Sequence, residues 1–133
     1  MKVQGSCHCG QIAYEAEVDP EGVSLCNCTD CQTFSGSAFR VTVRTPRESF
    51  KLLSGEPKGY VKTADSGAKR LHTFCGDCGA PVYACAVTDP TFYSLRVGCL
   101  RQRADLPPRR QIWYRSAVPW AMKLDGLPQI ERQ

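Results

Sequence analysis

Nine cysteines in a chain of 133 residues constrain its fold more than any other feature. Because nine is an odd number, the cysteines cannot all pair as disulfides within one chain. Seven of them fall into three tight groups, which are Cys7 with Cys9, then Cys26, Cys28 and Cys31, then Cys75 with Cys78. Clustered cysteines of this kind are typical of metal binding or thiol chemistry in a reducing compartment.

The first and third groups together predict a closed metal site. Cys75 and Cys78 form a C-x-x-C turn that can aim two sulfurs at one ion. Cys7 and Cys9 are two residues apart, so an extended strand points both sulfurs to the same side. Neither pair alone fills the tetrahedral coordination sphere of Zn²⁺, whereas the two pairs together fill it. We therefore expect one structural zinc ion bound by Cys7, Cys9, Cys75 and Cys78.

The middle group predicts a different kind of site. Cys26, Cys28 and Cys31 offer three thiolates, and three protein ligands with one open position are the pattern of a catalytic zinc. The open position could hold water or a substrate thiol, which zinc would deprotonate near neutral pH. The spacing alone leaves two alternatives, namely a fourth protein ligand that closes the site and a set of redox thiols.

Short alternating segments predict a mainly β fold. Polar and apolar residues alternate along 11–18 and 39–44, while 81–86 and 92–97 are apolar enough for buried strands. One short helical turn is expected from Thr29 to Phe34. We predict a single domain over residues 1–133, built from several small antiparallel sheets with few or no long helices. The irregular segment after 106 holds both tryptophans, so we expect it to pack on the body.

Composition and charge exclude several classes of function. No segment approaches the roughly 20 apolar residues of a membrane helix, and the polar start leaves no room for the apolar part of a signal peptide. We therefore expect a cytoplasmic protein with no membrane partner. The net charge of +4 and the interspersed acidic residues fall short of the basic stripe of a nucleic-acid-binding protein. No nucleic-acid partner is expected, and the sequence carries no signal of oligomeric state.

Three titratable residues outside the groups are interpreted as structural. Cys85 lies in an apolar run and Cys99 follows a predicted strand, so both are expected to be packing residues, as free cysteines often are. His72 lies within a predicted strand and has no partner visible in the sequence, which favours an ordinary strand residue.

Three motifs resemble the glutathione-dependent formaldehyde-activating enzyme family. They are the segments 5–10 (Gly-Ser-Cys-His-Cys-Gly), 26–31 (Cys-Asn-Cys-Thr-Asp-Cys) and 74–81 (Phe-Cys-Gly-Asp-Cys-Gly-Ala-Pro). The similarity extends over roughly residues 3–131. It implies coiled β-sheets with two zinc ions per chain, the structural one at Cys7, Cys9, Cys75 and Cys78 and the catalytic one at Cys26, Cys28 and Cys31. In the family the position before Ile112 often carries His, whereas this chain has Gln111.

The resemblance implies a zinc-dependent carbon–sulfur lyase or synthase. Glutathione, the small-molecule partner, would bind its thiol at the catalytic zinc and add to formaldehyde or a similar aldehyde, forming S-hydroxymethylglutathione. Arginine grips carboxylates in a bidentate way, so the candidates for holding glutathione are Arg40, Arg44, Arg70 and Arg96, unless these side chains simply face solvent. Two alternatives stay open: a non-catalytic zinc-binding module for a thiol ligand or a protein partner, and a redox enzyme with Cys99 as nucleophile.

Overall fold

The chain folds mainly into β-strands. The computed structural model describes residues 1–133, with ten strands, one α-helix and five single-turn 3₁₀ helices. The strands are β1 (Lys2–Ser6), β2 (Ala13–Glu17), β3 (Ser24–Cys26), β4 (Arg40–Pro46), β5 (Lys51–Ser54), β6 (Lys58–Thr63), β7 (Lys69–Phe74), β8 (Pro81–Ala86), β9 (Phe92–Arg96) and β10 (Arg110–Ile112). The α-helix is α1 (Thr29–Ser35). The predicted β-rich class without long helices is confirmed, and none of the helices has the length and apolar character needed to cross a bilayer.

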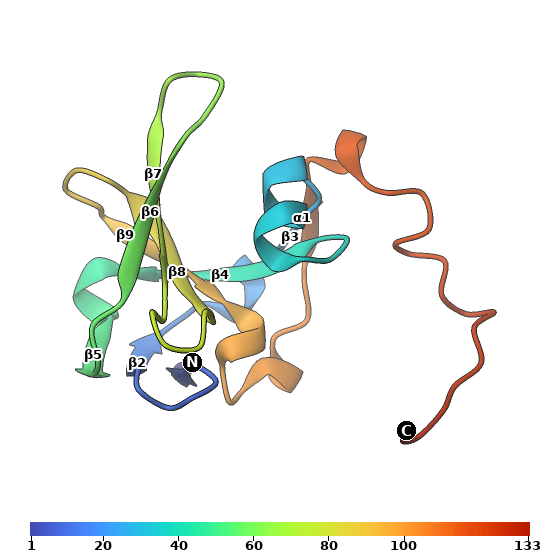
Figure 1. Ribbon diagram of the computed structural model, residues 1–133, viewed down its shortest axis with the longest axis horizontal. Helices are drawn as coiled ribbons and strands as arrows, with labels where there is room; N and C mark the ends of the chain where they lie inside the picture. Colours follow the sequence, from blue (N-terminus) through green and yellow to red (C-terminus); the bar gives the residue numbers. More distant parts are fainter.

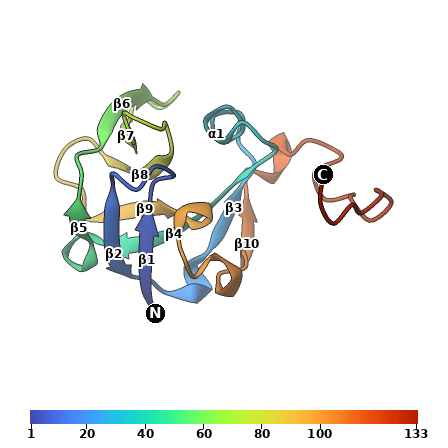
Figure 2. The ribbon, with the colours of Figure 1, turned by 60° about the horizontal axis from the view of Figure 1, so that its bottom comes forward.

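The strands form two sheets (Figure 2). One has three strands in the order β1-β2-β5, and the other has seven in the order β10-β3-β4-β9-β8-β7-β6. Neighbouring strands are antiparallel, as expected, with one exception: β10 runs parallel to β3, pairing Ile112 with Cys26. A parallel pair needs a long connection, and β10 follows β3 only after most of the chain has intervened.

Side-chain alternation gives the seven-stranded sheet two unlike faces. On β4 the side chains of Val43 and Thr45 are fully buried against the three-stranded sheet, where Tyr14 and Ile12 complete the core. Successive residues of a strand point to opposite faces, so the even-numbered positions of β4 line the other face. Burying each large apolar side chain of the core contributes roughly 1.5–3 kcal/mol. The core thus fixes the register that leaves the arginines of β4 on the open face.

An aromatic cluster joins the two sheets. Phe50 lies between the sheets, with its ring centroid 5.3 Å from that of Tyr14, 5.3 Å from that of Tyr83 and 5.0 Å from that of Tyr93. Tyr83 and Tyr93 stack on one another at 4.5 Å. Such ring pairs add about 0.5–1.5 kcal/mol each beyond the area that they bury.

The predicted helical turn is α1, which stands on the same side of β4 as the β6–β7 hairpin and faces it (Figure 1). The Sγ atom of Cys28 caps it by accepting a hydrogen bond from the backbone N–H of Cys31 at 3.3 Å. The helix ends at Gly36, whose φ of 64° suits a residue without a Cβ. Lys62 of the hairpin reaches across to Asp30 of α1 at 2.6 Å, so the hairpin and the helix are tied together.

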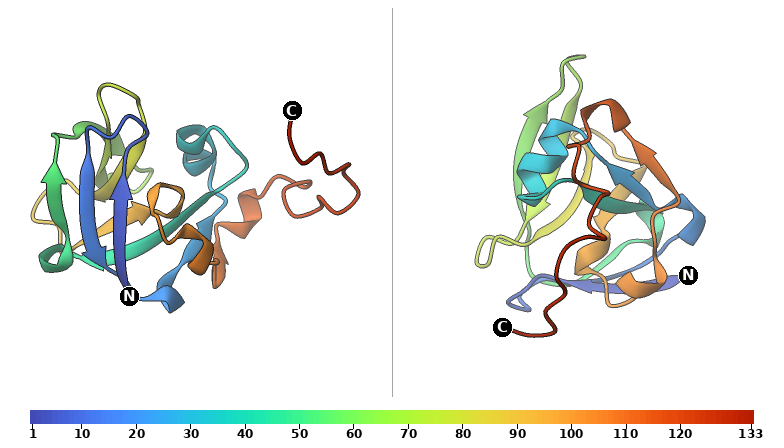
Figure 3. Two further views of the ribbon diagram at one scale, coloured as in Figure 1. Left: turned by 90° about the horizontal axis from the view of Figure 1, so that it is seen from below. Right: turned by 90° about the vertical axis from the view of Figure 1, so that its right-hand side faces the viewer.

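The expectation that the C-terminal segment packs on the body is wrong for most of that segment. Residues 110–112 form β10, but beyond 117 the chain leads away from the sheets (Figures 1 and 3). Trp113 and Trp120 are both more than half exposed. The backbone hydrogen bonds after 117 are local turns, and Ala121 is the one buried residue there. The two tryptophans therefore do not mark packing here, because the side chains of Trp113 and Trp120 stay mostly uncovered.

Candidate active site and metal centres

The first and third cysteine groups come together in space. The sulfurs of Cys7, Cys9, Cys75 and Cys78 all lie within 4.8 Å of one another. The Cys7–Cys9 sulfur distance is 3.6 Å and the Cys9–Cys75 distance is 3.7 Å. Tetrahedral Zn²⁺ with Zn–S bonds near 2.3 Å separates its sulfurs by about 3.8 Å, so the four thiols fit that ion. A metal bound here would connect the start of the chain to its middle.

The backbone around Cys75 and Cys78 stabilises negative charge on the thiol of Cys78. The N–H of Gly79 donates to the carbonyl of Cys75 at 2.8 Å, and Gly79 has a φ of 77° that glycine adopts without strain. Backbone N–H groups of Ala80 and Cys9 lower the pKa of Cys78 to about 6. A thiol with such a pKa is mostly thiolate at neutral pH, which is the form that binds metal.

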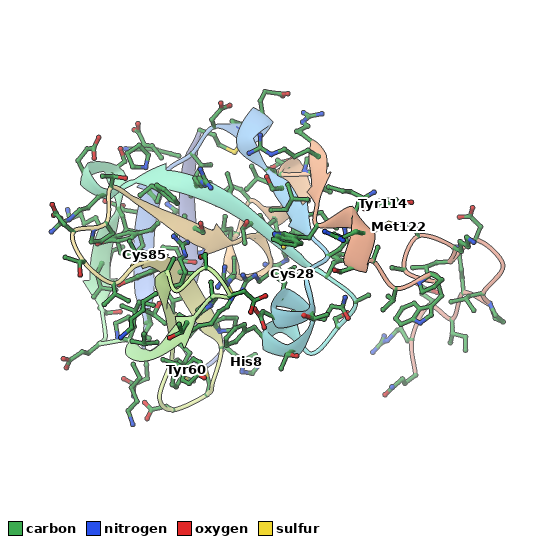
Figure 4. The ribbon with its side chains drawn as sticks, turned by 90° about the horizontal axis from the view of Figure 1, so that it is seen from above. His8, Cys28, Tyr60, Cys85, Tyr114 and Met122 are labelled. Atoms are coloured by element: carbon green, nitrogen blue, oxygen red, sulfur yellow. The ribbon has the colours of Figure 1, made fainter.

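The middle group forms a second, three-membered cluster. The sulfurs of Cys26, Cys28 and Cys31 lie within 4.8 Å of one another, and no further cysteine, histidine or carboxylate joins them. Cys26 ends β3, Cys28 caps α1 and Cys31 belongs to the first turn of that helix. Figure 4 labels Cys28 beside α1, and the side chain of Cys28 is half-buried. The strand-to-helix turn therefore brings three thiols together. A tetrahedral metal ion bound by them would have one coordination position without a protein ligand.

The three thiols differ in acidity. Burial raises the pKa of Cys31 and of Cys26. Burial also acts to raise the pKa of Cys28, but the N–H of Cys31, the two neighbouring thiols and the charge of Lys62 outweigh it, so the pKa of Cys28 is lowered. The lowered pKa of Cys28 favours its thiolate, which is the form that binds metal.

A cationic pocket of about 310 Å³ opens beside the three thiols, over the face of the seven-stranded sheet that points away from the core. Its walls include all four arginines predicted as candidates, Arg40, Arg44, Arg70 and Arg96. Lys62 and Arg110 also line it, and sequence reasoning missed both because they come from β6 and β10, whose neighbours were not predicted. The single carboxylate of the pocket, on Asp30, is paired with Lys62. The pocket therefore suits an anionic ligand.

His72 lies within strand β7 as predicted, but the expectation that it has no partner is wrong. Arg96 donates from Nη2 to Nδ1 of His72 at 3.3 Å, so the neutral ring carries its proton on Nε2. The ring also stacks on Phe34 at 4.2 Å and lines the cationic pocket. Burial, followed by the charges of Arg96 and Arg40, lowers the pKa of His72 to about 4. The partners come from other strands, and no local sequence signal could have found them.

Gln111 of β10 bonds to the segment that carries two of the three thiols. Its Oε1 accepts a hydrogen bond from Nδ2 of the fully buried Asn27 at 3.2 Å, and Asn27 lies between Cys26 and Cys28. Gln32 of α1 donates to the carbonyl of Asn27 at 2.9 Å. These bonds fix the backbone from which two of the thiols project.

The two remaining cysteines lie outside both clusters. Cys85 is buried in β8, and Cys99 is half-buried with its thiol donating to the carbonyl of Pro81 at 3.2 Å. Burial raises the pKa of both thiols. Neither has the acidity of a redox nucleophile, so their predicted packing role agrees with the geometry.

Comparison with known proteins assigns the family. A sequence model of the glutathione-dependent formaldehyde-activating enzyme family matches residues 2–116. The chain belongs to this family. Within the family, a protein from Colletotrichum graminicola, provisionally named a glutathione-dependent formaldehyde-activating enzyme, is 30% identical over 79 residues. That match covers 58% of this chain and 40% of the relative, so this chain spans less than half the length of the family member that it matches.

The fold agrees with a solved structure. A crystal structure of a Rhodobacter sphaeroides protein superposes with a TM-score of 0.63, covering 84% of this chain and 99% of that one. The two sequences are 21% identical, so the similarity concerns the fold alone.

Proposed function

We propose that this chain is a zinc-dependent carbon–sulfur lyase and synthase, which adds the thiol of glutathione, or of a related thiol, to formaldehyde or a similar aldehyde. The observation that carries the proposal is the triad of Cys26, Cys28 and Cys31, one ligand short of a tetrahedron, at the wall of a cationic pocket. The family's name supplies the two substrates.

Two zinc ions per chain fit the two clusters. The four-thiol cluster would hold a structural ion, and the triad would hold a catalytic one. Bound at the triad, Zn²⁺ would supply the positive charge that stabilises the thiolate of a thiol ligand at neutral pH. The 133 residues would act as one domain. Nine free thiols suit a reducing compartment such as the cytosol.

The residues of the pocket would orient the substrates. Arg44 and Arg70 lie over the ring of Phe92, at 4.2 Å and 5.8 Å from its centroid, and can hold carboxylates of glutathione. The sulfur then forms a bond to the carbonyl carbon, and the carbonyl oxygen receives the proton that the thiol gave up. His72 lines the pocket, and because Arg96 occupies its Nδ1, its Nε2–H is the donor that would be left for this oxygen. Fixing both reactants in one pocket removes much of the entropic barrier to their meeting.

Exchange spectroscopy tests the proposal. The uncatalysed addition also proceeds, so ¹³C-labelled formaldehyde and glutathione are mixed and the exchange rate between free aldehyde and adduct is measured against protein concentration. We expect a rate that rises linearly with protein and returns to the background with Cys28→Ser, while Cys99→Ser keeps the rise. An unchanged rate with glutathione bound to the protein would instead make the chain a binding module.

A further inference from the structure

Two guanidinium groups next to the three thiols have no carboxylate partner. Arg96 is 5% exposed, and its Nε has no hydrogen-bond partner. Arg40 is half-buried, and its Nε and Nη1 are both buried without a partner. None of the ion pairs of the chain involves either side chain. A buried guanidinium N–H without an acceptor is costly even where a nearby thiolate offsets its charge, so these donors suit an anion that is not part of the protein.

The strand register places this pair beside the thiols. Arg40 of β4 lies directly opposite Cys26 of β3, and such neighbours have Cα atoms about 4.5–5.5 Å apart. Arg96 of β9 lies opposite Thr42, two residues along β4 on the same face. Both guanidinium groups line the pocket that contains the thiols. An anion held by them therefore shares one pocket with the sulfur that reacts.

The rest of the pocket already offers cationic groups for the carboxylates of a tripeptide thiol. Arg44 is four residues along β4 from Arg40, or about 13 Å, and Arg70 lies with it over Phe92. The carboxylates of glutathione are at the two ends of the molecule, away from the sulfur, and can reach this remote part of the pocket. Formaldehyde is uncharged. With glutathione and formaldehyde bound, neither guanidinium group next to the sulfur would have a carboxylate partner.

We propose that Arg40 and Arg96 form a carboxylate subsite for the carbonyl substrate, and that this substrate is an aldehyde acid of the glyoxylate class, in which the carboxylate is bonded to the reacting carbon. The inference rests on the proposed thiol addition. Arginine binds a carboxylate through two parallel N–H donors, which fixes its orientation as well as its position. Only an acid with the carboxylate next to the carbonyl places the negative charge beside the sulfur.

The reaction balances without a further reagent. The sulfur forms a bond to the aldehyde carbon, the π electrons of the carbonyl pass to its oxygen, and that oxygen takes the proton released by the thiol. The product is a hemithioacetal that keeps its carboxylate, and the reverse step breaks the same carbon–sulfur bond. No oxidant or reductant is consumed.

The first test compares two aldehydes in the exchange experiment. Zinc-loaded protein is mixed with glutathione and either ¹³C-glyoxylate or ¹³C-formaldehyde at equal concentration and pH 7. We expect the protein to accelerate glyoxylate exchange at least about tenfold more than formaldehyde exchange. Acceleration of formaldehyde alone, or of both equally, overturns the inference and leaves the proposed function standing. If the protein accelerates neither exchange reaction, both the inference and the proposed function are wrong.

The second test measures the subsite without chemistry. Trifluoroacetate is an unreactive carboxylate, and its ¹⁹F signal reports binding to the zinc-loaded protein in the absence of thiol. We expect Arg40→Gln to weaken this binding at least about tenfold and Arg40→Lys to restore part of it, because a lysine keeps the charge but not the bidentate donors. Arg47→Gln is the control, since Arg47 pairs with Asp89 outside the pocket. If Arg40→Gln binds trifluoroacetate as tightly as the parent protein does, the proposed subsite is wrong. Arg40 is half-buried, so its variants are expected to fold; circular dichroism checks this.

Discussion

The ring of His72 stacks on the ring of Phe34 with their centroids 4.2 Å apart and their planes at 10°. The first residue belongs to β7 and the second to α1, whose first turn carries Cys31. Together with the Lys62–Asp30 ion pair, this stack attaches the β6–β7 hairpin to the helix and so defines one wall of the cationic pocket. The position of the thiols thus depends on residues far away in sequence.

The acid stability of the fold is predicted to depend on His72. Its pKa is about 4 in the folded chain, below the usual 6.5, because of burial and the nearby charges of Arg96, Arg40 and Lys62. Between these values the unfolded chain binds the extra proton, so the free energy of unfolding falls as the pH falls from 6.5 to 4, by at most about 3 kcal/mol.

Urea unfolding of the parent and of His72→Gln at several pH values measures this effect. Glutamine can still accept from Arg96 but does not titrate, so the variant should lose less stability over this window than the parent. Both proteins share any acid loss of metal, which cancels in the comparison. Equal losses in the two proteins would exclude His72 as the titrating group.

The closed thiol cluster is predicted to stabilise the fold through its metal. Cys9 is exposed, and an exposed side chain without a special role changes stability by less than about 0.5 kcal/mol when replaced. If Cys9 is a zinc ligand, Cys9→Ser should instead lower the free energy of unfolding by more than about 3 kcal/mol, since zinc binding and folding are coupled.

The matched control is Cys99→Ser, which alters a half-buried thiol outside the cluster and should cost about 1 kcal/mol or less. Unfolding curves and zinc content are measured on both variants. A Cys9→Ser protein as stable and as rich in zinc as the Cys99→Ser protein would argue against the structural site.

The close pairing of β1 with β2 leaves no space for a side chain at Gly5. A Cβ there would overlap the ring of Tyr14, the cross-strand neighbour of Gly5. Gly5→Ala should therefore destabilise the fold by roughly 1–3 kcal/mol, because the buried ring would have to leave its position. Gly98→Ala is the control, since a Cβ at Gly98 meets no atom within 4 Å. Thermal unfolding of the two variants is compared, and similar melting temperatures would contradict the packing described here.

Residues 123–133 are predicted to be dispensable for folding. Leu124, Leu127 and Ile130 are all more than half exposed, and the backbone of the segment bonds only within local turns. Removing the segment should change the free energy of unfolding by less than about 1 kcal/mol. A larger loss would mean that these side chains are covered in solution.

The strands and the two thiol clusters could be predicted because their signals are local. Alternation around Tyr14 and Val43 identifies strands, and the C-x-C and C-x-x-C spacings put pairs of thiols on one side of the chain. The family motifs then indicate which pairs meet. The converging sulfurs agree with that partition, although no sequence rule dictates that Cys9 and Cys75 lie 3.7 Å apart.

The pocket and the C-terminal segment could not be predicted in the same way. Each arginine of the pocket is locally like any exposed strand residue, and only the order β3-β4-β9-β8-β7-β6 brings Arg40, Arg96 and His72 together. The parallel pairing of β10 with β3 is equally non-local. Conversely, Trp113 and Trp120 suggested packing by composition, but no neighbouring element covers them.

The most direct test of the thiol-activating role is a native mass spectrum of the purified protein with glutathione, alongside Cys28→Ser. The account predicts two zinc ions and one glutathione per chain for the parent, and one zinc ion without glutathione for the variant. A parent with one zinc ion and no glutathione would contradict it, and would leave the cluster around Cys9 as the only metal site of the chain.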